Sequence, residues 1–487
     1  MQFCNTASTK HHVFRLNAAL LMSLAAIGGA SAATLSVGPG KTYAAPCAAF
    51  AKAQAGDVIE IDGGKTYSGD VCAISANGLT IRGVNGRPKI DAAGKNAQGK
   101  AIWVVKGNDI KIENVEMYGA KVADKNGAAL RLEGTNFTLR SSFLHDNENG
   151  ILSGANANSN IVIEYSEFGY NGFGDGYSHN LYIGNVASLV FRFNYSHDAN
   201  VGHNLKSRAK LNTIAYNRFS STPAGQTGST KSGKPSYEID LPNGGTSYVI
   251  GNVIHQPASH NNPAMVSYAM EGPTNPGQDL YVVNNTFLND DSSRGTFVQL
   301  GSKVTTPALL QNNIFGGTGT VSNQTSAIDK NNFRSVAPGF VNRAAYDLHP
   351  TANALVINAG AAPGKSKSGF DLTPTAQYKH TATSETRPAS GALDIGAYES
   401  GTATPTTPAP APAPAPSVPA PAPTITWTQC AAEGGTCSFT GTREVRYGVP
   451  GYYNTKTVTA KTACTNAVFG DPKKSTAKFC SYSSLAK

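Results

Sequence analysis

A short pattern of alternating apolar residues returns along most of the chain. It reads IKIENVEMYG from Ile110, IVIEYSEFGY from Ile161 and YVVNNTFLN from Tyr281. Its equivalent positions are separated by 27, 24, 28, 23, 36, 33 and 28 residues, and they are Ile112, Leu139, Ile163, Phe191, Ile214, Ile250, Val283 and Gln311. A strand-like repeat of this length indicates stacked coils, because one coil cannot bury its apolar face alone. We therefore predict an all-β solenoid of parallel strands, whose successive coils lie about 4.8 Å apart.

The N-terminal residues 1–32 are typical of a secretory signal peptide. Lys10 and Arg15 give a positive start, the apolar stretch Leu16–Ile27 is too short to span a bilayer, and small residues end at Ala32. No later run is long and apolar enough for a membrane span. We expect a secreted protein, extracellular or periplasmic.

Six cysteines follow the predicted signal peptide. An even number in an exported chain favours disulfides over metal binding or thiol catalysis. Cys47 and Cys72 are expected to pair near the start of the solenoid. The other four, Cys430, Cys437, Cys464 and Cys480, allow three pairings, and the sequence does not select one.

Composition divides the mature chain into three parts. Residues 33–401 carry the repeats, with an N-terminal cap expected over about 33–108, and residues 402–424 are almost pure Pro, Ala and Thr, as in an extended linker. Residues 425–487 form a small cysteine-rich domain, predicted to be β-rich and stapled by disulfides. From Thr424 onward, 8 Lys and Arg face 3 Asp and Glu, so this part carries most of the positive charge and could favour an anionic polymer or surface.

The coils, their recurring Asn residues and the ending DIGAYE from Asp394 resemble the right-handed parallel β-helix superfamily of pectate-lyase-like exported proteins. The resemblance covers about 33–400 and implies a single-stranded right-handed β-helix, a fold that hosts lyases, hydrolases, esterases, epimerases and adhesins. One set of Asn residues is expected to stack as an inward amide ladder, namely Asn114, Asn217, Asn252, Asn285 and Asn313.

The C-terminal phrases EGGTCSFTGTREVRYG and TACTNAVFGDP resemble small modules of secreted carbohydrate-active enzymes. That likeness implies sugar binding by the C-terminal domain. Trp427 and Tyr447 are the aromatic residues expected to stack on sugar rings, against the alternative that such rings only fill the domain's core.

A second strand in each coil predicts an outward face that carries polar side chains. Alternation places Leu181, Leu205 and Ile239 inside. The residues predicted to face outward are therefore Arg131, Glu133, Asn180, Tyr182, Asn204, Lys206, Arg208, Glu238 and Asp240. His179 and His203 begin matching HNL phrases one coil apart. Such a patch exceeds what building a coil requires, although rows of exposed ion pairs also occur in solenoids.

This patch suits β-elimination from a uronic-acid polymer. Arg208 is suited to neutralise the uronate carboxylate, because guanidinium grips carboxylate with two hydrogen bonds. Lys206 is the candidate base, and Tyr182 or His203 the candidate acid, with His179 as a further catalytic candidate. Asn180, Asn204, Arg131 and Glu133 are expected to bind substrate.

The run LKSRA from Leu205 resembles a strand of chondroitinase-B-like and alginate-lyase-like β-helix enzymes. The resemblance implies Lys206 as base, Arg208 as helper, and calcium at the substrate carboxylate. The sequence departs from that pattern, because His203 and Asn204 stand where the family has acidic metal ligands. Glu238 and Asp240, one coil later, are the acids that could hold calcium through oxygen ligands.

Three other functions remain open at this stage. Glu238 and Asp240 are about 6.6–7 Å apart from strand rise alone, a separation that a glycoside hydrolase permits. A uronan C5-epimerase would remove the same proton without elimination, and a noncatalytic adhesin would bind the sugar only. The expected partner is an acidic polysaccharide rather than nucleic acid, because the repeat region shows no cationic stripe with interleaved aromatic residues. We expect a monomer.

Overall fold

The computed structural model describes residues 32–221, 234–345, 347–389, 391–401 and 427–486. The predicted signal peptide and the predicted linker 402–424 fall, apart from Ala32, outside these residues. The chain divides into two compact units, Met1–Thr404 and Pro405–Lys487, and each is described by itself.

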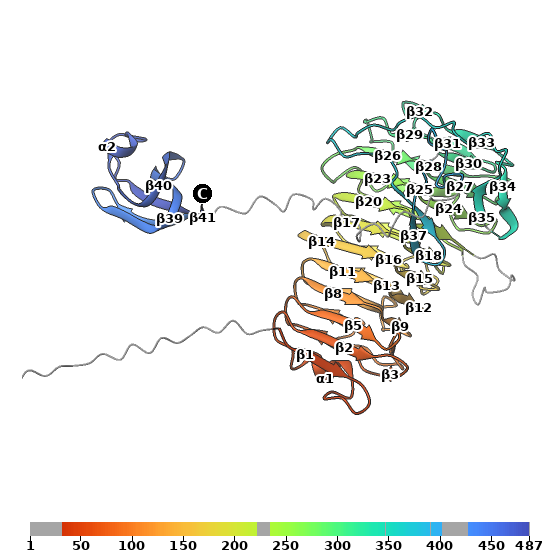
Figure 1. Cartoon of the computed structure of the whole chain (residues 1–487), viewed down its shortest axis with the longest axis horizontal. Coiled ribbons are helices and arrows are strands. Elements are labelled where there is room, and N and C mark those ends of the chain that lie inside the picture. Colours follow the sequence, from red (N-terminus) through yellow and green to blue (C-terminus); the bar gives the residue numbers. More distant parts are fainter. Residues whose placement is uncertain (1–31, 222–233, 346, 390, 402–426, 487) are drawn as a thin grey trace, which may run out of the picture. The chain divides into compact units, whose positions relative to one another are not determined.

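The first unit is a right-handed parallel β-helix built from three parallel sheets (Figure 1). The repeat predicted the stacked parallel coils, and the family resemblance implied their right-handed turn. A full coil gives one strand to each sheet, in the order first, second, third. The first sheet contains β1 Thr34–Val37, β2 Val58–Asp62, β5 Thr80–Val84, β8 Ile110–Glu113, β11 Phe137–Arg140, β14 Asn156–Glu164, β17 Val186–Arg192, β20 Leu211–Ala215, β23 Thr246–Ile250, β26 Leu280–Val283, β29 Leu309–Gln311 and β32 Ile328–Lys330.

The second and third sheets follow the same coil order. The second contains β3 Thr66–Ser68, β6 Lys89–Asp91, β9 Glu116–Tyr118, β12 Phe143–His145, β15 Glu167–Gly169, β18 Tyr195–His197, β21 Arg218–Ser220, β24 Val253–Gln256, β27 Thr286–Asn289, β30 Ile314–Gly316 and β33 Phe333–Ser335. The third contains β4 Cys72–Ile74, β7 Ala101–Val105, β10 Ala128–Leu132, β13 Asn149–Ser153, β16 Leu181–Ile183, β19 Leu205–Ser207, β22 Ile239–Leu241, β25 Ala264–Tyr268, β28 Thr296–Leu300 and β31 Thr320–Ser322.

The core is the inside of the coils, where one side chain stacks on its equivalent in the next coil. Phe287 on β27 stacks on Phe315 on β30, its partner in register, with ring centroids 5.2 Å apart. The helix α1 (Pro46–Phe50) packs near the start of the stack, and the ring of its Phe50 meets the buried Trp103 edge-on. The apolar alternation of the sequence thus becomes a continuous buried column.

The amide ladder is confirmed for Asn217, Asn252, Asn285 and Asn313, but the placement of Asn114 was wrong. Each backbone N–H of Asn217, Asn252 and Asn285 donates to the side-chain oxygen of the next rung at 2.9 Å. In the coil of Asn114 the ladder position is Val115, whose N–H donates to Ser142 Oγ at 3.2 Å. Asn114 is one residue earlier, in the left-handed conformation with φ 55° that turns the chain between the first and second sheets.

The register also corrects the later repeat positions by one residue. Ile214 pairs with Val249, which pairs with Val282, and Val282 pairs with Leu310. The predicted equivalents were Ile250, Val283 and Gln311. The predicted positions were wrong by one residue because two apolar residues follow each other in these strands. Only the pairing with the previous coil shows which of the two side chains points inward.

Two hairpins and a short 3₁₀ helix follow the last coils. They are β34 Phe340–Asn342 with β35 Asp347–Pro350, β36 Ala376–Lys379 with β37 Thr383–Thr386, and η1 Arg343–Ala345. This segment packs against the side of the coils: the N–H of Thr375 donates to Tyr216 Oη at 3.0 Å, and Asn284 Nδ2 donates to the carbonyl of Asp394 at 2.9 Å. Inside it, Arg387 Nε donates to Glu399 Oε2 at 2.8 Å in a nearly fully buried ion pair.

The second unit is a four-stranded antiparallel sheet in the order β38, β41, β39, β40. Its elements are β38 Trp427–Ala432, β39 Thr436–Val449, β40 Tyr452–Ala463, α2 Asn466–Phe469 and β41 Phe479–Ala486. Disulfides join Cys430 to Cys437 and Cys464 to Cys480, which selects one of the three open pairings. The predicted bond between Cys47 and Cys72 is confirmed in the first unit. None of the helices in the described part of the chain has the length and hydrophobicity that a bilayer span requires.

Candidate functional site

Three side chains predicted to act together lie side by side on the outer face of the third sheet. Tyr182 on β16 pairs in register with Lys206 on β19, and Lys206 pairs with Asp240 on β22. Their neighbours Leu181, Leu205 and Ile239 are fully buried, so alternation sets the outward direction of the residues that follow them. Arg208 lies two residues beyond Lys206, and Ser267 on β25 continues the row after Asp240.

Arg208 holds this group together through four hydrogen-bonding contacts. Its Nε donates to the hydroxyl oxygen of Tyr182 at 2.7 Å, and Nη1 donates to Asn243 Oδ1 at 2.6 Å. Nη1 and Nη2 also meet the two carboxylate oxygens of Glu271, at 2.7 and 3.0 Å. The guanidinium is therefore fixed in orientation beside the phenol of Tyr182.

Lys206 lies between two carboxylates and an aromatic ring. Its Nζ is 3.4 Å from Asp240 Oδ2 and 3.4 Å from Glu271 Oε1, and 5.8 Å from the centre of the Tyr182 ring. Only 12% of its side chain is exposed. Burial raises the pKa of Asp240, and the charge of Lys206 opposes that effect. The hydrogen bond from Arg208, followed by the charge of Lys206, holds the pKa of Glu271 below its usual range.

His179 and His203 stack on each other at the start of the same strands. Their ring centroids are 4.5 Å apart, and the backbone N–H of His203 donates to His179 Nδ1 at 3.0 Å. The N–H of Tyr237 donates to His203 Nδ1 at 3.2 Å in the next coil. Gly202 makes this close stacking possible, because a Cβ there would lie 2.0 Å from the carbonyl oxygen of Ser178.

Burial makes both imidazoles neutral. It lowers the pKa of His179 to about 3, with Lys206 and Arg208 adding to the effect. It also lowers the pKa of His203 well below the usual value, with His179 and Lys206 adding to it. Each Nδ1 accepts a backbone hydrogen bond, so each Nε2 carries the proton. His203 Nε2 is 3.6 Å from Asp240 Oδ2, and the centre of the His179 ring is 5.8 Å from that of the Tyr182 ring, so the two imidazoles pack beside the site.

The predicted outward orientation of Asn180, Asn204 and Glu238 was wrong. All three are buried, and they form a chain in which Asn180 Nδ2 donates to Asn204 Oδ1 at 2.8 Å and Asn204 Nδ2 donates to Glu238 Oε2 at 2.5 Å. Each immediately precedes a strand, at the corner where the chain enters the third sheet. Alternation does not hold through a corner, and a polar side chain there turns inward to bond backbone groups, as Asn180 Nδ2 does with the carbonyl of His197 at 2.7 Å.

Glu238 and Asp240 consequently do not act as a pair. Glu238 lies in the coil interior, where burial raises its pKa to about 8, and its Oε1 has no hydrogen-bond partner among the described residues. Asp240 contacts Lys206 and accepts from Ser267 Oγ at 2.9 Å. A buried carboxyl that keeps its proton does not suit calcium, which binds ionised oxygen ligands. No group of three or more His, Cys, Asp or Glu within the described ranges is placed to hold a metal ion.

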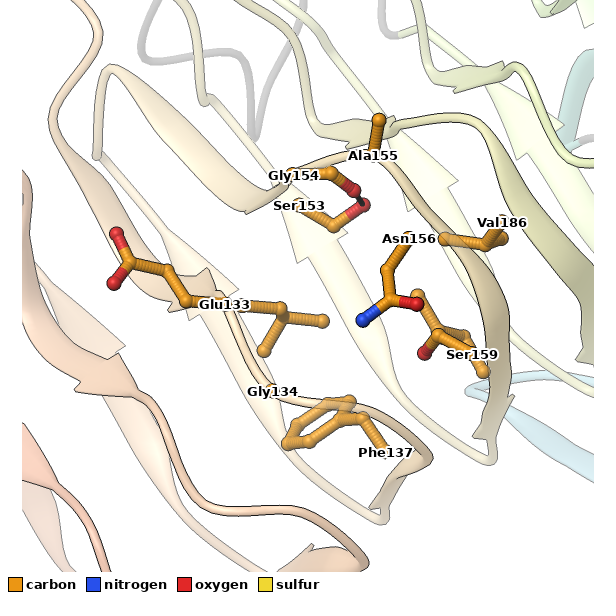
Figure 2. A pocket seen from close by; sticks show the side chains of 11 residues that line it. Glu133, Gly134, Phe137, Ser153, Gly154, Ala155, Asn156, Ser159 and Val186 are labelled. Atoms are coloured by element: carbon orange, nitrogen blue, oxygen red, sulfur yellow. Dashed lines mark hydrogen bonds between the residues drawn. The ribbon is translucent and has the colours of Figure 1, made fainter.

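Arg131 and Glu133 lie on the same face but earlier in the stack. Arg131 is in register with Leu152, which pairs with Tyr182, so three strand spacings, about 14 Å, separate Arg131 from Lys206. Glu133 is bound by Lys100 Nζ at 2.5 Å. It also borders a small cavity of about 20 Å³, but Figure 2 shows its carboxylate directed away from Ser153, Asn156 and Ser159. That cavity has the size for a water molecule rather than a sugar.

Sequence reasoning missed Glu271 and Asn243. Both follow third-sheet strands, Asn243 after β22 and Glu271 after β25, in turns that lead back to the first sheet. Asn243 is itself fixed, because its Nδ2 donates to Thr274 Oγ1 at 2.8 Å. The outward phase of a strand gives no signal for residues in these turns, whose direction depends on how the chain leaves the sheet.

In the C-terminal domain the two predicted sugar-binding aromatics have different surroundings. Tyr447 is fully buried, and its hydroxyl donates to Glu433 Oε1 at 2.6 Å, so its predicted role as a sugar-stacking surface was wrong. It packs against Phe469 in the domain's core because a domain this small needs large side chains there. Trp427 is partly exposed, and the Arg446 guanidinium lies 4.5 Å from its ring centre and 4.2 Å from that of Tyr453.

Comparison with known proteins gives structural similarity only. No protein-family model and no curated protein matches the sequence. Among solved structures, pectate lyase Pel9A aligns at 15% identity with a TM-score of 0.52, over 72% of this chain and 90% of that one. The pectin methylesterase from Aspergillus niger aligns at 12% identity and a TM-score of 0.32, over 50% of this chain and 89% of that one. Pectin methylesterase PemA from Erwinia chrysanthemi aligns at 13% identity with a TM-score of 0.30, over 46% of this chain and 79% of that one. The chain is therefore a right-handed parallel β-helix protein that shares the fold of pectate lyase Pel9A.

Proposed function

We propose that the protein is a secreted polysaccharide lyase that cleaves an acidic, uronic-acid-containing polysaccharide by β-elimination. The observation that carries this proposal is the placement of Lys206, Arg208 and Tyr182 side by side on neighbouring coils, with Arg208 Nε 2.7 Å from Tyr182 Oη. A base, a carboxylate-binding guanidinium and a hydroxyl donor are the three groups that the reaction requires. The likeness in fold to Pel9A, a pectate lyase, agrees with this class.

Arg208 binds the uronate carboxylate and withdraws charge from it, which acidifies the neighbouring C5 proton. Lys206, once its ammonium group has released a proton to solvent, takes the C5 proton. The electrons of the C5–H bond form a C4–C5 double bond, and the bond from C4 to the glycosidic oxygen breaks. Tyr182 donates its hydroxyl proton to the leaving oxygen. Its oxygen already accepts from Arg208, so its own proton is free for another acceptor.

The neutral imidazoles of His179 and His203 fit a positioning role better than that of an acid. Each has its Nδ1 occupied by a backbone donor, and burial opposes the imidazolium form of both. They pack as uncharged rings beside Tyr182 and Asp240. Calcium enters no step of this scheme, because the residues proposed for it from the sequence do not fit the ion.

The hydrolase alternative loses the carboxylate pair that the sequence predicted for it, because Glu238 lies inside the coil and does not face the site with Asp240. The epimerase shares the first proton transfer but needs no donor for a leaving oxygen, and Tyr182 supplies one. An adhesin would need only groups that bind the anion. The proposed site also contains an amine that can act as a base, because Lys206 lies in register with Tyr182.

Secretion and carbohydrate binding by the C-terminal domain complete the proposal. Three disulfides are typical of proteins that fold in an oxidising compartment. In the C-terminal domain, the exposed part of Trp427 beside Arg446 and Tyr453 suits contact with an anionic sugar.

The decisive experiment is a screen of polygalacturonate, alginate and glycosaminoglycans with the full-length protein. A lyase releases unsaturated uronates, which absorb in the ultraviolet, whereas a hydrolase releases reducing ends without that absorbance. An epimerase leaves chain length unchanged, and an adhesin gives binding without turnover. Absence of ultraviolet-absorbing products from every acidic polymer tested would overturn the lyase proposal.

A further inference from the structure

One carboxylate of the chain itself already occupies the cationic centre of the site. Glu271 meets Arg208 with both of its oxygens, at 2.7 Å from Nη1 and 3.0 Å from Nη2, and lies 3.4 Å from Lys206 Nζ. This two-pronged contact is the geometry that guanidinium adopts with any carboxylate. The position of the Glu271 carboxylate therefore marks a carboxylate-binding site between Arg208 and Lys206.

The attachment of Glu271 allows its side chain to leave without rebuilding the fold. Its backbone N–H donates to the carbonyl of Pro242 at 3.0 Å, and Gly272 N–H donates to the carbonyl of Ala269 at 2.9 Å, so the turn itself is held. The Glu271 side chain is 48% exposed, against 22% for Arg208. Rotation of one half-exposed side chain into solvent is enough to vacate the carboxylate position.

The cations keep their orientation when Glu271 leaves. Arg208 remains bound to Tyr182 Oη and to Asn243 Oδ1, which are separate partners on different coils. Lys206 remains 3.4 Å from Asp240. Unlike Glu271, Asp240 is fixed, because only 4% of its side chain is exposed and it accepts a hydrogen bond from Ser267. Of the two acids beside Lys206, Asp240 is a fixed part of the site and Glu271 is its displaceable part.

We propose that Glu271 is an internal stand-in for the substrate carboxylate, which must displace it from Arg208 and Lys206 in order to bind. This inference rests on the proposed function and names the subsite for the uronate carboxylate at the cleavage position. It also assigns Glu271 a role in specificity: a neutral or methyl-esterified sugar offers no anion to replace Glu271, so only a free carboxylate opens the site.

The test measures binding of short oligosaccharides by the full-length protein and its Glu271→Gln variant. The probes are trimers of galacturonate, mannuronate and guluronate, each as the free acid and as the methyl ester, titrated by calorimetry. Removing the competing charge is expected to tighten binding of a free-acid trimer by roughly two- to fivefold, the size expected of a half-exposed ion pair. Binding of the ester should not change. Glu60→Gln is the matched control, because Glu60 also forms an arginine pair, 2.6 Å from Arg82, but in the first sheet.

Kinetics and stability separate this role from a structural one. On a cleaved polymer, Glu271→Gln should lower KM by the same factor, whereas a purely structural ion pair would lower thermal stability and leave KM unchanged or raised. Equal or weaker binding of the free acids by the variant, equal gains on acid and ester, or no binding of any trimer would each overturn the inference. Tighter binding without any cleavage would support the subsite and reject only the lyase function.

Discussion

Arg208 donates a hydrogen bond from Nε to the hydroxyl oxygen of Tyr182, at 2.7 Å and across two neighbouring coils. The two residues are 26 positions apart in the chain, and the coil repeat brings them together. The contact fixes the orientation of the Tyr182 phenol beside Arg208. The site therefore depends on the stacking of coils and not on any local motif.

Replacing Lys206 by Ala is expected to lower kcat by at least about 100-fold, because a positioned base contributes 10²–10⁴-fold to a proton transfer. The measurement is the rate of ultraviolet-absorbing product from the polymer identified in the screen. Lys111→Ala is the control, since Lys111 is exposed on β8 in the first sheet. A Lys206→Ala enzyme with wild-type kcat would exclude Lys206 as the base.

Tyr182→Phe removes the hydroxyl that accepts from Arg208 and keeps the ring beside His179. We expect kcat to fall about 100-fold or more with a small change in KM, because the leaving oxygen loses its proton donor. A substrate whose leaving group needs no proton, such as a uronate that carries nitrophenoxide at C4, where the bond breaks, should restore much of the rate. Equal losses on both substrates would show that Tyr182 acts otherwise than as the acid.

Glu238→Gln is expected to change the pH dependence of stability and to spare catalysis. Burial raises the pKa of folded Glu238 from 4.5 to about 8, so between these values the folded state holds a proton that the unfolded state releases. The stability that this proton contributes is fully present below about pH 4.5 and is lost as the pH rises to about 8. Because a difference of one pKa unit corresponds to about 1.4 kcal/mol, the total loss is a few kcal/mol.

Urea unfolding at pH 5 and pH 8 checks this prediction. Between pH 5 and pH 8, the wild type should lose more free energy of unfolding than Glu238→Gln. The buried histidines have lowered pKa values, which raise stability as the pH rises, but they contribute equally to both proteins and cancel in the difference. Parallel losses in both proteins would contradict an interior, protonated Glu238. A large loss of kcat in Glu238→Gln would return the hydrolase reading to consideration.

Arg387→Met is expected to destabilise the first unit by roughly 3–5 kcal/mol, because it leaves a buried carboxylate without its partner. Arg387 Nε donates to Glu399 at 2.8 Å, and its Nη1 donates to the carbonyl of Ala397 at 2.9 Å. Chemical denaturation gives the free energy of unfolding. The exposed pair of Arg82 with Glu60 is the comparison, and Arg82→Met should cost less than about 1 kcal/mol. Similar small effects from both substitutions would show that the buried pair of Arg387 with Glu399 does not stabilise the first unit more than an exposed ion pair does.

Trp427→Ala is expected to weaken retention on insoluble acidic polysaccharide and to leave kcat on a short soluble substrate unchanged. Loss of a sugar-stacking aromatic lowers the local concentration of the enzyme on the polymer, but it leaves the catalytic step in the other domain unchanged. A pull-down with insoluble substrate measures retention, and deletion of residues 402–487 gives the limiting value. Unchanged retention in both proteins would show that the domain does not anchor the enzyme.

Much of the candidate site could be predicted because strand alternation is a local property. Leu181 and Leu205 are apolar, so Tyr182 and Lys206 had to face outward, and the repeat length placed them on adjacent coils. The same reasoning failed at Asn180, Asn204 and Glu238, because each lies at a corner, where backbone groups of the turn attract polar side chains inward. Alternation has no meaning where the chain changes sheet.

The sequence by itself determined the solenoid, its coil length, the pairing of Cys47 with Cys72 and the outward phase of Tyr182, Lys206 and Arg208. Each of these follows from periodicity or composition within one or two coils. Only the tertiary structure decided that Glu271 reaches Arg208, 63 residues earlier, and that Glu238 lies inside while Asp240 lies outside. Turn geometry and the contacts between non-consecutive coils set those positions, and neither leaves a periodic signal in the chain.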